Sequence, residues 1–332
     1  MARPRKAKVA RDEQPIPQTM IDAVRQFADP EKAHEFFVQL RWPFGVACPR
    51  QGCGNADVAY MAKQHRWYCR ECKGQFTAKV GTIFEDSPIP FTKWLPAFWL
   101  LASNRNGISS YELARALKVT QRTAWFMLHR IRESMREGDF AEPLSGEVEA
   151  DETWIGGRKN REMKVNVLGQ KKLAHGPGTG KATVFGMVER ARPGHAHNRV
   201  RAMVVADRSS ATLLPRLRAN VLPGTVLYTD ALRSYTAAQQ HYAHHVIDHS
   251  IRYVEGRVHT NTIENFWAVL KRTLNGKYIA PRVFHLDRYL DEQVYRFNAR
   301  NEKDGPRFAE VVKRADGRRL TWKRLTDKST RG

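Results

Sequence analysis

The sequence has no hydrophobic run approaching the roughly 20 residues that a membrane-spanning helix requires. Its first residues, MARPRKAKVARDEQP, lack the apolar core of a secretory signal. Acidic residues are scarce, with 34 Asp and Glu against 56 Lys and Arg, and the formal net charge is +22. These absences predict a cytoplasmic protein that does not enter a membrane. The positive excess favours a nucleic-acid partner, because cations that bind phosphates release counterions.

Changes in composition divide the chain into segments, and no internal repeat is visible. A length of 332 residues with 42% hydrophobic residues allows two or three compact units. The basic residues of the last segment include Arg318 and Arg319, which we expect to contact DNA. The segments are a basic arm and short helix (1–40), a cysteine-containing region (41–80), a helical region (90–140), an α/β region (145–300) and a basic tail (301–332).

The cysteines are few and closely grouped. Cys48, Cys53, Cys69 and Cys72 form the pattern C-x4-C-x15-C-x2-C, in which the first loop is longer than the common C-x2-C. Paired thiolates on two tight turns can close a tetrahedral site, and the bound metal supplies folding energy to a segment with little core. Disulfides are the alternative, but a cytoplasmic setting and the C-x2-C spacing argue against them. The pattern therefore predicts structural Zn²⁺ in a zinc ribbon over residues 41–80.

The stretch ISSYELARALKVTQRTAWFMLHRIRE has apolar residues at helical spacing on both sides of residues 118–120. It predicts two helices joined by a turn. Thr120 can cap the second helix, because its hydroxyl can accept a hydrogen bond from a free amide. Gln121, Arg122 and Thr123 then point outward from the first turn, where a recognition helix meets DNA base edges. Any two packed amphipathic helices look similar, but the charge and the adjacent cysteine region favour a helix-turn-helix.

Three acidic residues that are far apart in the sequence have clear secondary-structure contexts. Asp151 lies in the alternating run GEVEADETWIGG, and Asp230 ends the β-branched and aromatic run TVLYTD. Glu264 lies in NTIENFWAVLKR, whose apolar residues recur at helical spacing. Their order and spacing are typical of polynucleotidyl transferases. Metal ions held by such carboxylates can activate a water or a 3′-hydroxyl and stabilise the leaving oxygen of a phosphodiester.

Together these motifs resemble a bacterial insertion-sequence transposase of the DDE type. The resemblance is to the ISXO-like group, which places a zinc ribbon and a helix-turn-helix before an RNase H-like catalytic domain. It extends from about Arg41 to Arg300 and implies a multidomain chain with an α/β catalytic domain, a mixed sheet flanked by helices. The matching stretches are RWPFGVACPRQGC, YCRECKGQF, VEADETWIGGR, LYTDALRSY, HTNTIENFWAVLKR and DEQVYRFNAR.

The resemblance also implies the residues of the catalytic site. It implies Asp151, Asp230 and Glu264 as ligands of Mg²⁺ or Mn²⁺, with Lys271 as the accompanying basic residue. Lys271 follows Glu264 by two helical turns and can hold a DNA phosphate, although an ordinary surface lysine is the alternative. Relatives in this group can carry an Asn at the third position, and Asn261 and Asn265 flank Glu264. We favour Glu264, because a carboxylate binds a hard cation better than an amide does.

The implied activity is DNA transposition by a protein associated with the bacterial nucleoid. The partners are double-stranded DNA at the terminal inverted repeats of the element and a target DNA. Joining two ends requires at least two protomers, so we expect a homo-oligomer assembled on DNA. The alternative is a zinc-ribbon and helix-turn-helix regulator whose RNase H-like domain is inactive.

Within the catalytic region we expect strands at residues 148–155, 182–191, 199–207 and 225–230, with a helix at 209–221. This order is that of an RNase H-like sheet. The aromatic residues near the acids can stack on bases or pack in the core, and we favour packing. They are Trp154, Phe266 and Trp267.

Other motifs compete with this interpretation. The run HGPGTGKAT resembles a phosphate-binding loop, but His175 and Ala182 replace groups that the motif uses, so we expect a flexible basic loop. Five histidines are expected to lie on the surface or to contact phosphate instead of binding metal: His241, His244, His245, His249 and His259. The rival carboxylates are Asp248, Glu255 and Asp207, of which Asp207 is the best substitute because it also ends a strand.

Overall fold

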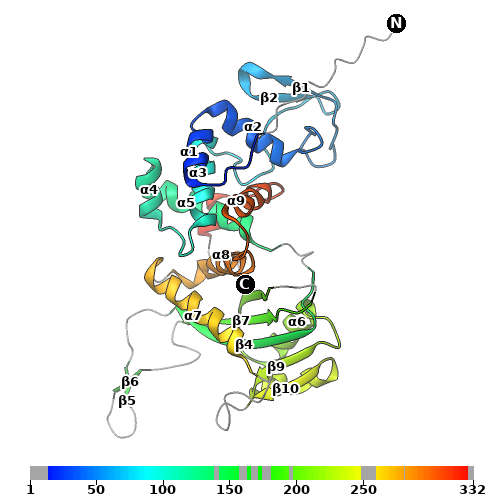
Figure 1. Ribbon diagram of the computed structural model, residues 1–332, viewed down its shortest axis with the longest axis vertical. Helices are drawn as coiled ribbons and strands as arrows, with labels where there is room; N and C mark the ends of the chain where they lie inside the picture. The colour runs from blue at the N-terminus through cyan, green and yellow to red at the C-terminus, as the bar shows by residue number, and fades with distance from the viewer. Residues whose placement is uncertain are drawn as a thin grey trace. The chain divides into compact units, whose positions relative to one another are not determined.

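The computed structural model describes residues 14–137, 142–156, 163–165, 171–173, 181–193, 197–247, 259–279 and 281–327 (Figure 1). The chain folds as two compact units. The first takes its residues from Met1–Asn104, Ser110–Ser134 and Glu302–Leu325, and the second from Arg105–Ser109, Met135–Asn301 and Thr326–Gly332. No helix among the described residues has both the length and the apolar composition needed to cross a membrane.

The first unit contains helices packed around aromatic side chains. The ring of Phe308 lies 5.8 Å from that of Phe36 and 5.2 Å from that of Trp99. Glu302–Leu325, within the segment predicted as a basic tail, belong to the first unit, and Phe308 packs in its core. The apolar face of their main helix is hard to see in the sequence among many charged residues. The helices are α1 (Met20–Phe27), α2 (Pro30–Arg41), α3 (Phe91–Ser103), α9 (Asp304–Lys313) and α10 (Trp322–Thr326).

A three-stranded antiparallel sheet carries the second cysteine turn, which begins at Cys69, the last residue of its second strand. Its strands lie in the order β1 (Val58–Met61), β2 (Arg66–Cys69) and β3 (Gln75–Thr77), with the short 3-10 helix η1 (Ala62–Gln64) between the first two. Trp67 of β2 is buried and stacks on Phe76 of β3, with 5.8 Å between ring centres. So small a core offers little hydrophobic stabilisation of its own.

Two further helices of the first unit meet at a tight turn, as the sequence predicts. They are α4 (Ser110–Leu117) and α5 (Gln121–Met135). Lys118 takes a left-handed conformation with φ of 49°, which reverses the chain. The Thr120 hydroxyl accepts a hydrogen bond from the Thr123 amide at 3.1 Å, so the predicted cap of α5 is present.

The second unit is built on a five-stranded mixed sheet. The strand order is β10-β9-β4-β7-β8, in which β7 is antiparallel to both of its neighbours and β4, β9 and β10 run parallel. A separate pair of strands is formed by β5 (Met163–Val165) and β6 (Lys171–Leu173). The strands of the main sheet are β4 (Glu147–Gly156), β7 (Lys181–Glu189), β8 (Arg199–Val205), β9 (Val226–Asp230) and β10 (Ala243–Ile247). The helices of this unit are α6 (Ser210–Asn220), η2 (Arg233–Gln240), α7 (Asn261–Gly276), η3 (Val283–His285) and α8 (Leu286–Asn298).

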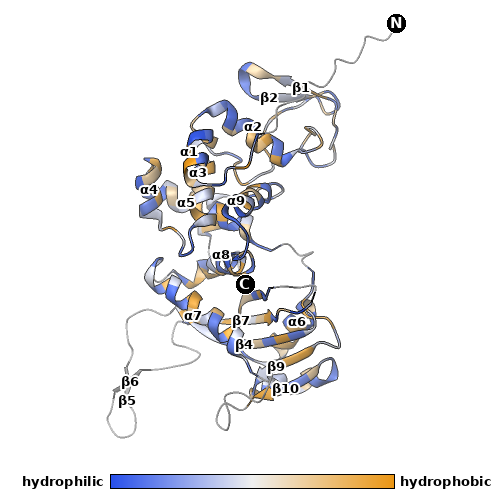
Figure 2. Cartoon of the chain, viewed as in Figure 1, coloured by the Kyte–Doolittle hydropathy of each residue, from blue (hydrophilic) through white to orange (hydrophobic). Residues whose placement is uncertain are grey.

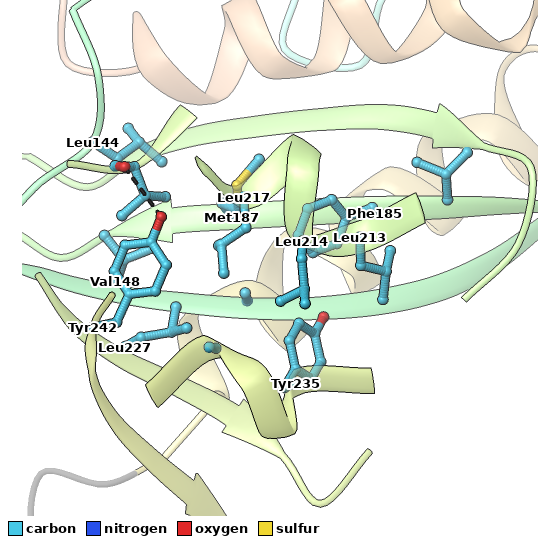
Figure 3. Packing of buried hydrophobic residues seen from close by; sticks show 14 residues of the cluster. Leu144, Val148, Phe185, Met187, Leu213, Leu214, Leu217, Leu227, Tyr235 and Tyr242 are labelled. Atoms are coloured by element: carbon cyan, nitrogen blue, oxygen red, sulfur yellow. Dashed lines mark hydrogen bonds between the residues drawn. The ribbon is translucent and has the colours of Figure 1, made fainter. Parts of the chain in front are cut away.

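The two faces of the main sheet have separate hydrophobic cores, because side chains alternate along each strand. Val148 and Ala150 of β4 pack with residues of α6 and η2 on one face (Figure 3). Ile155 of β4 packs with residues of α7 and α8 on the other face. β7 is apolar along most of its length, since both of its faces are covered (Figure 2). The same alternation directs Asp151 toward α7 and Glu152 toward η2.

The mixed sheet flanked by helices confirms the α/β region expected from the sequence. The four expected strands and the helix between the last two are present as β4, β7, β8, α6 and β9. The fifth strand, β10, was missed because its sequence AHHVI was considered only as part of a histidine cluster. The basic arm and residues 175–180 of HGPGTGKAT lie outside the described residues.

Candidate functional site

Asp151 lies in the middle of β4 and faces α7. Its Oδ2 accepts a hydrogen bond from Trp267 Nε1 at 2.9 Å. Burial raises the pKa of Asp151 to about 6, and the negative charges of Asp230 and Glu264 act in the same direction. An acid with a raised pKa beside two other acids is a candidate for binding a cation.

Asp230 ends β9, the strand beside β4. The register between these strands pairs Glu149 with Tyr228. Two residues further along both strands, Asp151 in the middle of β4 lies level with Asp230, where β9 ends. The Asp230 Oδ1 atom accepts a hydrogen bond from the Leu232 amide at 3.1 Å, which orients the carboxylate where the strand ends.

Glu264 lies in the first turn of α7 and is exposed. The hydroxyl of Thr260 donates a hydrogen bond to its Oε1 atom at 3.2 Å. Asn261, Asn265 and Lys271 are also exposed on this helix. The charge of Glu264 acts on Asp151, so the helix brings the third acid into the electrostatic range of the first.

The oxygen atoms of the three carboxylates are not gathered closely enough to share one metal ion. In the part of the chain that the structure describes, the four cysteines are the group of metal-ligating side chains gathered closely enough to share an ion. The donors are all hard oxygen atoms, which is the chemistry that Mg²⁺ and Mn²⁺ prefer.

A fourth acid, Glu152, lies next to Asp151 on the opposite face of β4. The hydroxyl of Tyr235 donates a hydrogen bond to it. Burial raises the pKa of Glu152 to about 7, with further contributions from the charges of Asp230 and Asp151, while Arg208 acts in the opposite direction. The sequence analysis missed this residue. Its position directly after Asp151 and the tyrosine in LYTDALRSY were the available signals.

The beginning of α7 is held by Glu149, a fully buried residue of β4. Its Oε2 atom accepts hydrogen bonds from the amides of Thr262 and Ile263, both at 2.9 Å. Arg190 Nε donates to Glu149 Oε1 at 2.7 Å and compensates its charge. This network fixes the turn that carries Glu264. The sequence analysis missed Glu149, because a helix cap from a distant strand leaves no local signal.

Gly186 of β7 provides room for the indole of Trp267. It pairs with Asp151 across the two strands. A Cβ atom at position 186 would lie 2.5 Å from Trp267 Cζ2 and 2.9 Å from Ile263 Cδ1, which is closer than real contacts allow. The absent side chain therefore lets Trp267 lie over β7 and reach Asp151.

The aromatic residues near the acids pack in the core as favoured from the sequence, with one exception. Phe266 and Trp267 are buried. Trp154 is partly buried, and the guanidinium of Arg208 lies over its ring, 4.4 Å from the ring centre.

The four cysteines of the first unit form a compact cluster of reduced thiols. The Sγ atoms of Cys48 and Cys72 are 3.8 Å apart, those of Cys53 and Cys69 are 3.6 Å apart, and all four lie within 4.8 Å of one another. A tetrahedral zinc site with Zn–S bonds of about 2.3 Å has sulfur atoms separated by about 3.8 Å. The geometry fits zinc, and the disulfide alternative is not borne out.

The three residues of α5 that the sequence predicts to meet DNA have partners within the first unit. Gln121 Nε2 donates a hydrogen bond to Ser110 Oγ at 2.8 Å, which connects α5 to α4. The guanidinium of Arg122 lies over the ring of Trp322, 4.4 Å from its centre. Thr123 donates its amide to Thr120. Arg122 is exposed, so its outward orientation agrees with the prediction.

Two arginines predicted to contact DNA make contacts within the first unit. Arg318 donates a hydrogen bond to the carbonyl of Glu133 in α5. Arg319 pairs with Asp86, with 2.6 Å between Nη2 and Oδ2, and with Glu85 at 3.4 Å. These pairs compete with a role in binding phosphate. Arg319 is about half exposed, so part of its guanidinium still faces solvent.

The rival residues have structural roles where they are described. Asp207 accepts hydrogen bonds from the amide and hydroxyl of Ser209 at the start of α6. His244 bonds to the Thr229 hydroxyl at 2.9 Å, and His259 lies 3.5 Å from Glu149. Asp248, His249 and Glu255 lie outside the described residues.

Comparison with known proteins places the chain in a family. Residues 143–298 match the model of the ISXO2-like transposase domain, and residues 28–75 match the transposase zinc-ribbon domain. An uncharacterized transposase-like protein of Haemophilus influenzae is 39% identical over 101 residues, which cover 30% of this chain and 81% of that protein. The chain belongs to the ISXO2-like transposase family.

A second relative is similar to this transposase family member over most of its length. An uncharacterized protein in transposable element ISH50 of Halobacterium salinarum is 28% identical over 273 residues. The alignment covers 76% of this chain and 85% of that protein. No solved structure matches the chain. The matched transposase domain includes Asp151, Asp230 and Glu264, and the matched zinc ribbon includes all four cysteines.

Proposed function

We propose that this chain is a DNA transposase that binds the ends of an insertion sequence and catalyses metal-dependent phosphodiester hydrolysis and strand transfer. The observation that carries the proposal is the placement of Asp151 on β4 next to β9, which ends at Asp230, with Trp267 of α7 hydrogen-bonded to Asp151 on the helix that also carries Glu264. The charges of Asp230 and Glu264 both act to raise the pKa of Asp151. Membership of the transposase family supports the same conclusion.

The strand order supports an RNase H-like catalytic domain. Numbered along the chain, the five strands of the main sheet lie in the order 5-4-1-2-3, and the second is antiparallel to its neighbours. In this arrangement the first and fourth strands are adjacent. Acids on these two strands and on the helix after the fifth strand can therefore meet at one edge.

Asp151, Asp230 and Glu264 would hold the divalent cation. Bound Mg²⁺ or Mn²⁺ supplies activation of a water or 3′-hydroxyl and stabilisation of the leaving oxygen. The protein's own groups position these ligands. Trp267 orients Asp151 through its indole hydrogen bond, and Glu149 holds the turn that carries Glu264. Lys271, two turns along α7, is proposed to bind a DNA phosphate.

The first unit is proposed to bind DNA through α5. Gln121, Arg122 and Thr123 occupy the first turn of that helix, where recognition helices contact base edges. Zinc held by the four cysteines would stabilise the adjacent sheet. The net charge of +22 supports a nucleic-acid partner, and pairing of two element ends requires a homo-oligomer assembled on DNA.

A cleavage and binding assay tests this proposal. Purified protein is incubated with linear DNA carrying the element's ends, with Mg²⁺, Mn²⁺, or EDTA as the control. We expect strand cleavage and joining only with a divalent cation. Specific retention of the ends without cleavage under all metal conditions would support a DNA-binding regulator and contradict the proposed enzyme.

A further inference from the structure

Arg208 connects three elements beside the carboxylate site. It follows β8 and precedes α6, and its guanidinium lies over the ring of Trp154 in β4, 4.4 Å from the ring centre. β7 lies between β8 and β4, so this side chain crosses toward the strand that carries the acids. Trp154 is two residues beyond Glu152 and has the same orientation on β4.

The backbone of Arg208 is also held in place. The hydroxyl of Ser234 donates a hydrogen bond to the Arg208 carbonyl. The hydroxyl of Ser210 donates in turn to the carbonyl of Ser234 at 2.8 Å. Ser234 lies in η2, four residues after Asp230. The arginine is therefore fixed by its backbone and by its stacked guanidinium, which lowers the entropy cost of binding a ligand.

The guanidinium of Arg208 lies on the strand that carries Asp151. It stacks on Trp154, three residues after Asp151 in β4. Among the described residues its side chain contacts the ring of Trp154, and the residue is partly exposed. Stacking occupies a face of the guanidinium and leaves its planar N–H groups available. Those groups match the geometry of phosphate oxygens.

We propose that Arg208, oriented by Trp154, binds a phosphodiester of the DNA strand next to the bond that is cleaved. The proposal rests on the proposed transposase function and adds a phosphate-binding site to it. Lys271 lies on α7, which covers the other face of the sheet. Arg208 would hold the strand from the α6 and η2 side, so that the acids meet the intended phosphodiester. Trp154 is a positioning residue in this arrangement.

The test uses the full chain and element-end DNAs that each carry one neutral methylphosphonate near the cleavage site. Arg208→Ala should lower the single-turnover cleavage rate roughly ten- to a hundredfold, the usual effect of losing a hydrogen bond to a charged group. Arg208→Lys should recover part of this rate, because it restores the charge but not the planar fork. Trp154→Leu should reduce the rate less than Arg208→Ala does.

A methylphosphonate at the contacted position should slow the wild-type protein and should not slow Arg208→Ala further. Arg216→Ala, an equal loss of charge at an exposed position of α6, is the control and should leave both the rate and the methylphosphonate pattern unchanged. Thermal unfolding should show all variants folded. If Arg208→Ala were slowed equally at every methylphosphonate position, or if Arg216→Ala behaved identically, the assignment would be wrong.

The two proposals fail in distinguishable ways. If wild-type protein cleaves the DNA and Arg208→Ala cleaves it equally well, the Arg208 site is wrong and the transposase function stands. If wild-type protein does not cleave, the affinity of wild type and of Arg208→Ala for the same methylphosphonate DNAs is measured in Ca²⁺. A position at which wild type loses affinity and Arg208→Ala does not would then support the phosphate site alone, and its absence would contradict that site.

Discussion

The cysteine site and the carboxylate site differ in how their ligands are brought together. The cysteines come from residues 48–72, a short segment with two turns, and their sulfur atoms already lie 3.6 to 3.8 Å apart in pairs. The carboxylates come from two strands and a helix spread over residues 151–264. The cysteines are brought together by turns within one short segment, whereas the carboxylates depend on the pairing of β4 with β9 and on the packing of α7 over β4. The difference shows that a local spacing can define a metal site completely, while a long-range site depends on the sheet.

The largest expected effect concerns the cysteine site. Replacing Cys69 and Cys72 by Ser together should release zinc and unfold residues 41–80, because structural zinc contributes about 10 kcal/mol or more to such segments. Metal analysis should give one zinc per wild-type chain and none in the variant. Hydrogen exchange should show lost protection in β1 to β3 and unchanged protection in the main sheet. A folded, reduced wild-type sample without zinc would contradict this prediction.

The carboxylate site is tested by Asp151→Asn and Asp230→Asn. Each change removes a charged oxygen ligand, and we expect cleavage to fall by roughly three orders of magnitude while DNA binding stays nearly unchanged. For the third position, Glu264→Gln should lower the cleavage rate severely. Asn261→Ala and Asn265→Ala should lower it only mildly. Cleavage by Asp230→Asn at the wild-type rate would rule out the assignment.

The positioning of Asp151 is tested by Gly186→Ala. The added methyl group overlaps the indole of Trp267, so we expect a loss of about 1–3 kcal/mol in stability and slower cleavage. Gly276→Ala is a matched control at the end of α7, where a Cβ atom meets nothing within 4 Å. It should be neutral or slightly stabilising. Denaturant unfolding and cleavage rates measure both effects, and equal behaviour of the two variants would contradict the close contact.

The smallest expected effect concerns the first turn of α5. Arg122→Ala should reduce the difference in binding free energy between element ends and random DNA. A bidentate base contact contributes about 1–3 kcal/mol to this difference, and we expect a loss at the lower end of that range. Arg115→Ala removes the same charge from an exposed position of α4 and should weaken binding to both DNAs alike. The affinities of both variants for both DNAs, measured over a salt series, test this difference. If Arg122→Ala also weakened both equally, Arg122 would be a phosphate contact.

The sequence alone determined the features that depend on local spacing. The C-x4-C and C-x2-C turns, the cap at Thr120 and the strands around Asp151 and Asp230 all follow from residues that are close together in the chain. The apolar periodicity of α7 likewise identified the helix that carries Glu264. These features are predictable because turn chemistry and side-chain alternation act over a few residues.

Only the tertiary structure decided which distant residues meet. It brought Glu149 to the beginning of α7, placed Gly186 opposite Asp151, and stacked Arg208 on Trp154. It also folded α9 into the first unit, where the sequence predicts a tail. Such contacts depend on strand order and on which face of the sheet a helix covers. A sequence pattern specifies that a residue is on a buried face, but the partner on the other side is fixed only when the whole sheet packs.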